Sequence, residues 1–170
     1  VHESTITNNM WSKTSVKYFI PWRIEVYDDE TNELLDTHIL NLKDKKVYIH
    51  LDSSALGDTI SWFPYLEEFR KKHDCHLVVS TYRNKWFKNT YPTLEFTEPG
   101  ELVYDIFAKY SMGWYYDGKE INNDLHPINP RTIPLQQTAS SILGLPYREI
   151  KPLLDIPEKP QTIEGDYICI

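Results

Sequence analysis

The chain of 170 residues contains few of the residue types on which several protein classes depend. It has two cysteines, Cys75 and Cys169, far apart and without metal-site spacing, so a disulfide-rich scaffold is excluded. We expect both to be buried free thiols in a reducing compartment. No apolar run approaches transmembrane length and no signal peptide is recognisable, which predicts no membrane span and a cytoplasmic location.

Glycine and positive charge are also scarce. The first strand-to-helix loop contains a single glycine, which excludes the G-x-G-x-x-G fingerprint of dinucleotide enzymes, and there is no G-x-x-x-x-G-K-[ST] phosphate loop. With 18 basic and 25 acidic residues the formal net charge is -7, which argues against a nonspecific nucleic-acid binder. The length suits one domain with an appendage. Because the chain starts at Val1 and stops inside an apolar run, we interpret it as part of a larger protein.

The first 43 residues are expected to form an appendage. A polar arm precedes Lys17 to Tyr27, in which apolar and polar side chains alternate as in a half-buried strand. A polar turn over residues 28–33 leads into a second run, Leu34 to Leu42. We predict a β-hairpin, the remainder of a β-rich domain, ahead of a main domain over residues 44–170.

The main domain opens with the pattern of a βαβ unit. Lys46 to Leu51 is a β-branched and aromatic run that predicts a buried parallel strand, and a second such run covers Cys75 to Thr81. Between them we predict a helix from about Asp58 to His73, whose regular part begins at Ser61 or Trp62 because Pro64 is tolerated only near a helix start. One face of this helix is apolar over Trp62, Phe63, Leu66, Phe69 and His73.

The rest of the chain predicts further elements of the same α/β domain. They are a short helix over Tyr82 to Tyr91, strands over Leu94 to Phe96 and Leu102 to Tyr110, a loop over residues 115–131, a helix over Pro134 to Leu143 and a strand over Asp166 to Ile170. The predicted fold is therefore a Rossmann-like parallel sheet with flanking helices.

The strongest candidate for chemistry is the pair Gly57-Asp58 after the first parallel strand. Ligands of such sheets are held at the carboxyl ends of the strands. Gly57 lets the backbone turn and approach a ligand, and a helix amino end offers free N–H groups. Asp58 could accept the proton of an attacking alcohol as a general base. The alternative from spacing alone is that Asp58 only caps the helix, because aspartate is a favoured N-cap.

Other polar groups are expected near the same edge. Hydroxyl contacts are available from Ser53, Ser54 and Thr59, and the loop after the fourth strand brings Gly113 and Trp114, whose ring could stack on a sugar or base or be only a loop aromatic. Gln136 at the start of the late helix could point into the cleft, and Arg131 is either a phosphate ligand or a surface residue. We predict no metal site, because the histidines and cysteines are not clustered.

At these residues the chain resembles a known family. The run L-D-S-S-A-L-G-D-T-I-S-W-F-P-Y-L-E-E-F-R-K-K-H-D-C, with V-V-S-T and N-T-Y-P after it, is similar to the bacterial autotransporter heptosyltransferases of the ADP-heptose glycosyltransferase group. The later pieces Y-S-M-G-W, N-P-R-T-I-P-L-Q-Q-T-A and I-L-G-L-P-Y are similar too. The resemblance covers most of the chain from about Ile20 onward, and the ordered set is more specific than the G-D element alone.

The resemblance implies a B-type glycosyltransferase, in which two Rossmann-like lobes face a cleft, and it assigns this chain to the amino-terminal lobe. It implies ADP-heptose as sugar donor, serine hydroxyls of an autotransporter adhesin as acceptor, a homo-oligomer, and iron held by a cysteine cluster in the carboxyl-terminal part. The family's catalytic aspartate corresponds to Asp58. The chain stops where the second lobe would follow, so we expect it to be inactive alone.

Two alternatives remain open from the sequence. The chain could be a noncatalytic module that binds the acceptor or assembles an oligomer, or the transferase could use another nucleotide sugar.

Overall fold

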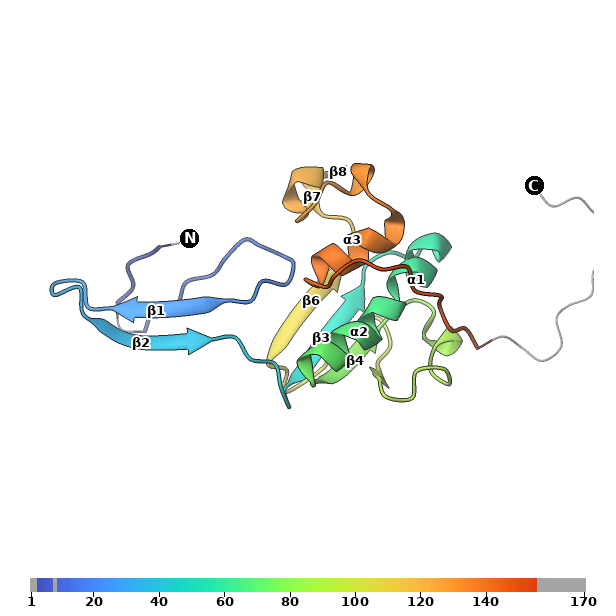
Figure 1. Cartoon of the computed structure of the whole chain (residues 1–170), viewed down its shortest axis with the longest axis horizontal. Coiled ribbons are helices and arrows are strands. Elements are labelled where there is room, and N and C mark those ends of the chain that lie inside the picture. The colour runs from blue at the N-terminus through green and yellow to red at the C-terminus, as the bar shows by residue number, and fades with distance from the viewer. Residues whose placement is uncertain (1–2, 8, 156–170) are drawn as a thin grey trace, which may run out of the picture.

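A computed structural model describes residues 3–7 and 9–155, and its centre is a four-stranded, all-parallel sheet (Figure 1). The strands lie in the order β5-β4-β3-β6. Their bounds are β3 Lys46–Leu51, β4 His76–Ser80, β5 Glu95–Phe96 and β6 Ala108–Met112. The first parallel strand is therefore central, and the predicted Rossmann-like α/β fold is confirmed.

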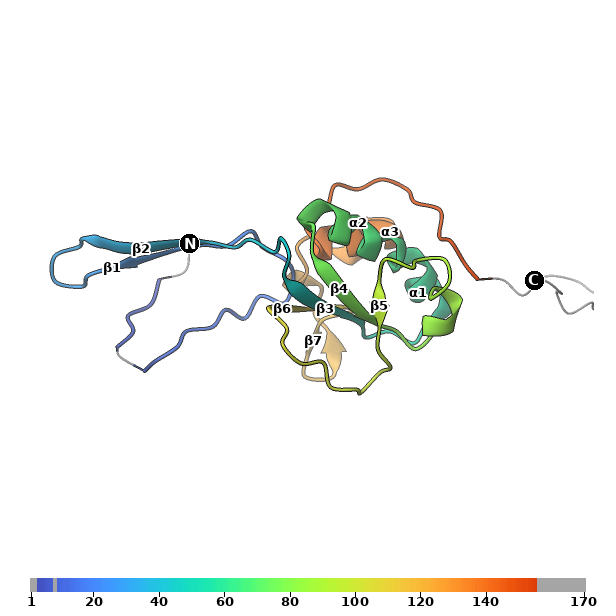
Figure 2. The same ribbon diagram turned by 90° about the horizontal axis from the view of Figure 1, so that it is seen from below.

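The helices α1 (Leu56–Trp62), α2 (Pro64–His73) and α3 (Leu135–Ile142) lie together on one side of the sheet (Figure 2). The strand pattern explains this arrangement, because alternate side chains of β3 point toward the helices and are buried, whereas those between them are half-buried. The predicted apolar helix face is also confirmed, since its aromatic and aliphatic members are buried in the core. The buried residues of β3 are Val47, Ile49 and Leu51.

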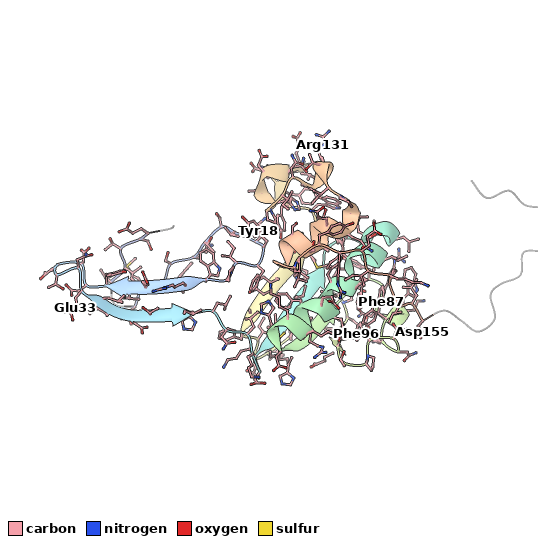
Figure 3. All side chains as sticks on the ribbon, viewed as in Figure 1. Tyr18, Glu33, Phe87, Phe96, Arg131 and Asp155 are labelled. Atoms are coloured by element: carbon pink, nitrogen blue, oxygen red, sulfur yellow. The ribbon has the colours of Figure 1, made fainter. Side chains whose placement is uncertain are left out.

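The single helix predicted from Asp58 to His73 is two consecutive helices. Helix α1 begins at Leu56, earlier than expected, and the break falls at Phe63. The cause is Pro64, which has no N–H to donate and therefore occupies the first position of α2, where none is needed. Phe63 fills the break, and its ring stacks on Phe87 at 3.7 Å between centroids. Phe96 also stacks on Phe63, with centroids 6.0 Å apart, and both Phe87 and Phe96 are labelled in Figure 3.

The predicted hairpin exists, but its burial was predicted wrongly. Strands β1 (Arg23–Tyr27) and β2 (Leu34–Ile39) pair antiparallel and extend away from the parallel sheet (Figure 1). Every residue of both strands is exposed. The segment before the hairpin is attached more firmly: Phe19 is buried against α2 and its N–H donates to the Ile142 carbonyl at 2.8 Å.

Several predicted boundaries shift in the second half. The strand expected over Leu102 to Tyr110 is β6, and residues 102–107 before it form a loop with exposed apolar side chains. The helix expected at Tyr82 is one 3₁₀ turn, η1 (Asn84–Trp86), while α3 confirms the predicted late helix. The strand expected over Asp166 to Ile170, like Cys169, lies outside the described residues. Cys75 is free and buried, and burial raises its pKa to about 11.

The expected loop over residues 115–131 contains short elements. They are β7 (Tyr116–Asp117), β8 (Glu120–Ile121), η2 (Asn123–Leu125) and η3 (Pro130–Thr132). Strands β7 and β8 form a small antiparallel pair beyond the end of β6. This segment returns the chain from β6 to α3.

Candidate active site

Two loops meet at the carboxyl edge of the central strands. Leu51, the last residue of β3, pairs with Met112, the last residue of β6, and the N–H of Asp52 donates to the Met112 carbonyl at 3.0 Å. The loop from β3 to α1 (residues 52–55) therefore lies beside the loop that follows β6 (residues 113–115). Parallel sheets place ligands at this edge, where the connections leave in different directions.

Asp58 lies where these loops meet and is buried. Its Oδ2 accepts two hydrogen bonds, from the Ser53 hydroxyl at 2.5 Å and from the Trp114 indole N–H at 3.0 Å. No described residue donates to its Oδ1. Ser53 is itself fixed, because its Oγ accepts from the Ala55 N–H at 3.1 Å. The carboxylate is thus oriented by one oxygen and has the other available.

Asp58 does not cap the helix in which it lies. The N-cap of α1 is Ala55, which makes no side-chain capping bond, and Asp58 is the third residue of the helix. Its carboxylate turns to Ser53 and Trp114 instead of to the backbone N–H groups of the first turn. The alternative that this residue is only a cap is therefore excluded.

A second carboxylate, Asp52, occupies the same edge. Its Oδ1 accepts from His50 Nε2 at 2.9 Å, and its Oδ2 accepts from the Ser111 hydroxyl. Burial alone would raise the pKa of Asp52, but the hydrogen bonds from His50 and Ser111 outweigh it and hold the pKa below the ordinary value of 3.8. Asp52 therefore stays ionised at this edge of the sheet.

The two glycines of the site differ in what surrounds them. A Cβ on Gly113 would lie 2.8 Å from the Cβ of Asp52, so the contact between the two loops requires glycine there. A Cβ on Gly57 would meet nothing nearer than Leu135 at 4.0 Å, and Gly57 is exposed. Its backbone is helical, so a sharp turn is not its purpose. The contact of Gly57 with a ligand stays a prediction.

Some of the other predicted site residues are exposed to solvent, whereas others have side chains that are already hydrogen-bonded within the fold. Ser54 is exposed at the edge of the site. Thr59 is fully buried and its hydroxyl donates to the Ala55 carbonyl. The amide of Gln136 makes two bonds with the backbone of Ile150, at 2.8 and 3.0 Å, which fasten the segment after α3. Arg131 points away from the sheet at the outer end of the segment before α3 (Figure 3).

Three residues at this edge lie outside the set predicted from sequence. Two are Asp52 and Arg83, whose Nη2 donates to the Ser54 carbonyl at 3.0 Å while its guanidinium lies 4.7 Å from the Trp86 ring centroid. The third is His126, which packs on the Trp114 loop. A polar residue just past a parallel strand is a signal that could have identified Asp52 and Arg83. No local pattern marks His126.

This arrangement suits general base catalysis. A carboxylate with one oxygen held by two donors and the other available can receive a proton from a hydroxyl within hydrogen-bond reach. Among the described residues, no cluster of three or more His, Cys, Asp or Glu side chains could hold a metal ion.

Known proteins resemble the chain in sequence over almost its whole length. It is 35% identical to the autotransporter heptosyltransferase BAHTCr of Citrobacter rodentium and 34% identical to TibC of Escherichia coli, over 96% and 94% of this chain. A crystal structure of TibC, an iron-containing dodecameric glycosyltransferase, superposes with a TM-score of 0.77 over 92% of this chain at 31% identity. This chain is a relative of the autotransporter heptosyltransferases. The predicted family is confirmed.

Two further findings limit what this relationship carries. The chain spans 40% of the length of BAHTCr and 39% of TibC. At 28% identity it also resembles BimC of Burkholderia thailandensis, an autotransporter heptosyltransferase described as inactive.

A second TibC structure, at 30% identity and a TM-score of 0.77, contains ADP-D-beta-D-heptose. No protein-family model matches the chain. Within the part that the structure describes, no helix is long and apolar enough to cross a membrane.

Proposed function

We propose that this chain is the amino-terminal lobe of a glycosyltransferase that moves heptose from ADP-heptose to serine hydroxyls of an autotransporter adhesin, with Asp58 as general base. The observation that carries this proposal is the geometry of Asp58, whose Oδ2 is held by Ser53 and Trp114 while Oδ1 receives no bond from a described residue. The relatives support the donor and the reaction class.

The proposed step is a single displacement at the anomeric carbon of the sugar. The serine oxygen of the acceptor forms a bond to that carbon from the face opposite the leaving group. The bond from the carbon to the phosphate oxygen breaks, and ADP leaves with the electron pair. The serine proton passes to Oδ1 of Asp58. Attack from the opposite face inverts the configuration of the sugar.

Several residues of this edge have proposed supporting roles. Gly57 and Ser54 are exposed beside Asp58, so they can contact the sugar or the acceptor through backbone and hydroxyl groups. Gly113 allows the Trp114 loop to approach Asp52. Thr59 and Gln136 support the site from within the fold, because their polar groups are bonded to Ala55 and Ile150.

We place a second wall of the site, most contacts to the nucleotide and any iron in a second lobe outside this chain. We expect the full-length protein that contains it, called the parent protein below, to be a cytoplasmic homo-oligomer, and TibC is described as dodecameric. The chain alone should be inactive.

The test is transfer by the parent protein. It is incubated with an acceptor adhesin segment and, separately, ADP-heptose, another ADP-sugar and a UDP-sugar, and the acceptor mass is followed. We expect a heptose-sized increase with ADP-heptose and none with Asp58→Ala. Asp74→Asn is the matched control, since Asp74 is an exposed carboxylate with φ 48° at the far end of α2, where asparagine fits.

A noncatalytic role is the second candidate, because BimC is described as inactive. It predicts that the parent protein binds the adhesin without transferring any of the sugars. A mass increase with the UDP-sugar alone would instead identify a different donor.

A further inference from the structure

Trp114 reaches Asp58 from a loop, and its indole packs against two rings. The first is Trp62 of α1, with ring centroids 5.5 Å apart and planes at 63°. Trp62 is fully buried and its own indole donates to the Leu135 carbonyl at 3.0 Å, so the core holds this ring in place. The second is His126, with centroids 6.0 Å apart. His126 follows Trp114 in the same segment, so this contact depends on the conformation of residues 115–126.

His126 closes the segment through the neighbour of Trp114. Its Nε2 accepts the backbone N–H of Tyr115 at 3.2 Å, and its ring stacks on the Tyr115 ring with centroids 4.4 Å apart and planes at 20°. The N–H of Asn122 donates to the Tyr115 carbonyl at 2.9 Å. His126 is 6% exposed and Tyr115 is 2% exposed, so both contacts are shielded from water.

The bond to Tyr115 requires a neutral imidazole. A backbone N–H can donate only to a ring nitrogen without a proton, so Nε2 is the acceptor and the proton is on Nδ1. Burial lowers the pKa of His126, which favours the same neutral form. Lys17 also lies at this cluster, with its Nζ 5.8 Å from the Tyr115 ring centroid.

We propose that His126 is a positioning residue for the general base. Its neutral imidazole closes the segment from Tyr115 to His126 against Trp114, so that the indole N–H stays on Oδ2 of Asp58 and Oδ1 remains available for the acceptor proton. The catalytic consequence rests on the proposed function, whereas the effect of His126 on the Trp114–Asp58 bond does not.

The first test measures that bond in this chain. The chain has five tryptophans, and the indole resonance of Trp114 is assigned in a proton–nitrogen NMR spectrum by its loss in Trp114→Phe. We expect His126→Phe, which keeps a ring but cannot accept from Tyr115, to move this resonance toward its position in Asp58→Ala, in which the acceptor of the Trp114 bond is removed. His126→Gln, which keeps an acceptor, should move it less. His73→Phe is the matched control, because His73 is also packed against aromatic rings but lies at the end of α2.

An unchanged Trp114 resonance in His126→Phe would overturn the proposal. So would unfolding of both His126 variants beside a folded His73→Phe, because that result would assign His126 to general stability rather than to the site.

The second test is kinetic and uses the parent protein. We expect His126→Phe to lower kcat about tenfold with little change in KM for ADP-heptose, as loss of base orientation requires. In a Trp114→Phe background the same change should have almost no further effect, since the two residues act through one bond. An equal loss in both backgrounds would contradict the proposal. If Asp58→Ala keeps full activity, the proposed function fails while the NMR result stands.

Discussion

Asp58 receives both of its hydrogen bonds on one oxygen, and for its proposed role as a base this asymmetry is more important than its burial. Bonds to a charged group contribute about 1.5–3 kcal/mol each, so Ser53 and Trp114 fix the orientation of the carboxylate strongly. The geometry therefore favours a base that is held in one orientation.

The protonation of His126 should be visible as a pH dependence of the site. Burial lowers its pKa below the ordinary 6.5, so the folded state prefers the neutral ring. The stability that it contributes is present above pH 6.5 and is lost as the pH falls through the lowered value. We expect the Trp114 indole resonance to move between pH 6.5 and the onset of acid unfolding in the unmodified chain.

His126→Gln, which cannot titrate, is the control for this dependence. The lowered pKa of His73, due to burial and to Lys72, adds to acid destabilisation but should not affect the Trp114 resonance. An identical pH profile in the His126→Gln chain would show that another group is responsible.

The loop after β6 contacts the loop that leads into α1, and Gly113 and Gly57 have different roles there. Gly113 is required by packing, because its neighbour within 3 Å is the Cβ of Asp52. Gly57 has open space around it and a helical backbone. Stability and activity should therefore respond differently at the two positions.

Alanine substitutions test this difference. Gly113→Ala should lower the free energy of unfolding by about 1–3 kcal/mol, because two loops must separate. Gly57→Ala should leave it unchanged or raise it by up to about 1 kcal/mol, since alanine favours a helix. In the parent protein Gly57→Ala should nevertheless weaken substrate binding, measured as an increase in KM. Urea unfolding and kinetics check both, and normal KM in Gly57→Ala would remove that residue from the site.

The sequence predicts some of these elements better than others. The βαβ unit from β3 to β4 was predictable because its strands are continuous apolar runs and its helix has one apolar face. The start of α1 was not, because Ala55 gives no capping signal and Asp58 gives a misleading one. The start of β6 was predicted too early, because the apolar residues from Leu102 to Phe107 have the pattern of a strand but form an exposed loop.

The contacts of the site are harder to predict than its elements. Asp58 and Trp114 are 56 residues apart, so no local pattern links them, although both were expected at the same sheet edge. The hydrogen bonds of the Gln136 side chain could not be predicted either, because its partner is the backbone of Ile150 in an irregular segment.

At the scale of the whole molecule, the strands of the hairpin place no side chain in the core of the sheet domain. Strands β1 and β2 bury no residue, whereas Phe19 packs on Phe69 and Tyr110 and covers Gly144, where a Cβ would lie 2.5 Å from the Phe19 ring. The short segments that flank the hairpin thus join it to the core without the hairpin contributing to that core.

Excision of the hairpin tests this separation. The Leu40 N–H donates to the Trp22 carbonyl at 2.8 Å, so residues 23–39 can be replaced by a short turn. We expect the free energy of unfolding to change by less than about 1 kcal/mol, as for surface substitutions. Phe19→Ala should instead lower it by about 3–5 kcal/mol, as for a buried aromatic. A large loss on excision, measured by urea unfolding, would show that the hairpin supports the sheet.

The chain spans about two fifths of the length of BAHTCr and TibC. The central claim therefore has to be tested in the parent protein, with the second wall present.

The most direct measurement is the turnover of Asp58→Asn in the parent protein, together with its affinity for ADP-heptose by calorimetry. Asparagine keeps the shape and can still accept from Ser53 and Trp114, but it cannot take a proton. The account predicts that kcat falls at least about a hundredfold while the donor Kd stays within about twofold. Turnover close to that of the unmodified protein would contradict the assignment of Asp58 as the base.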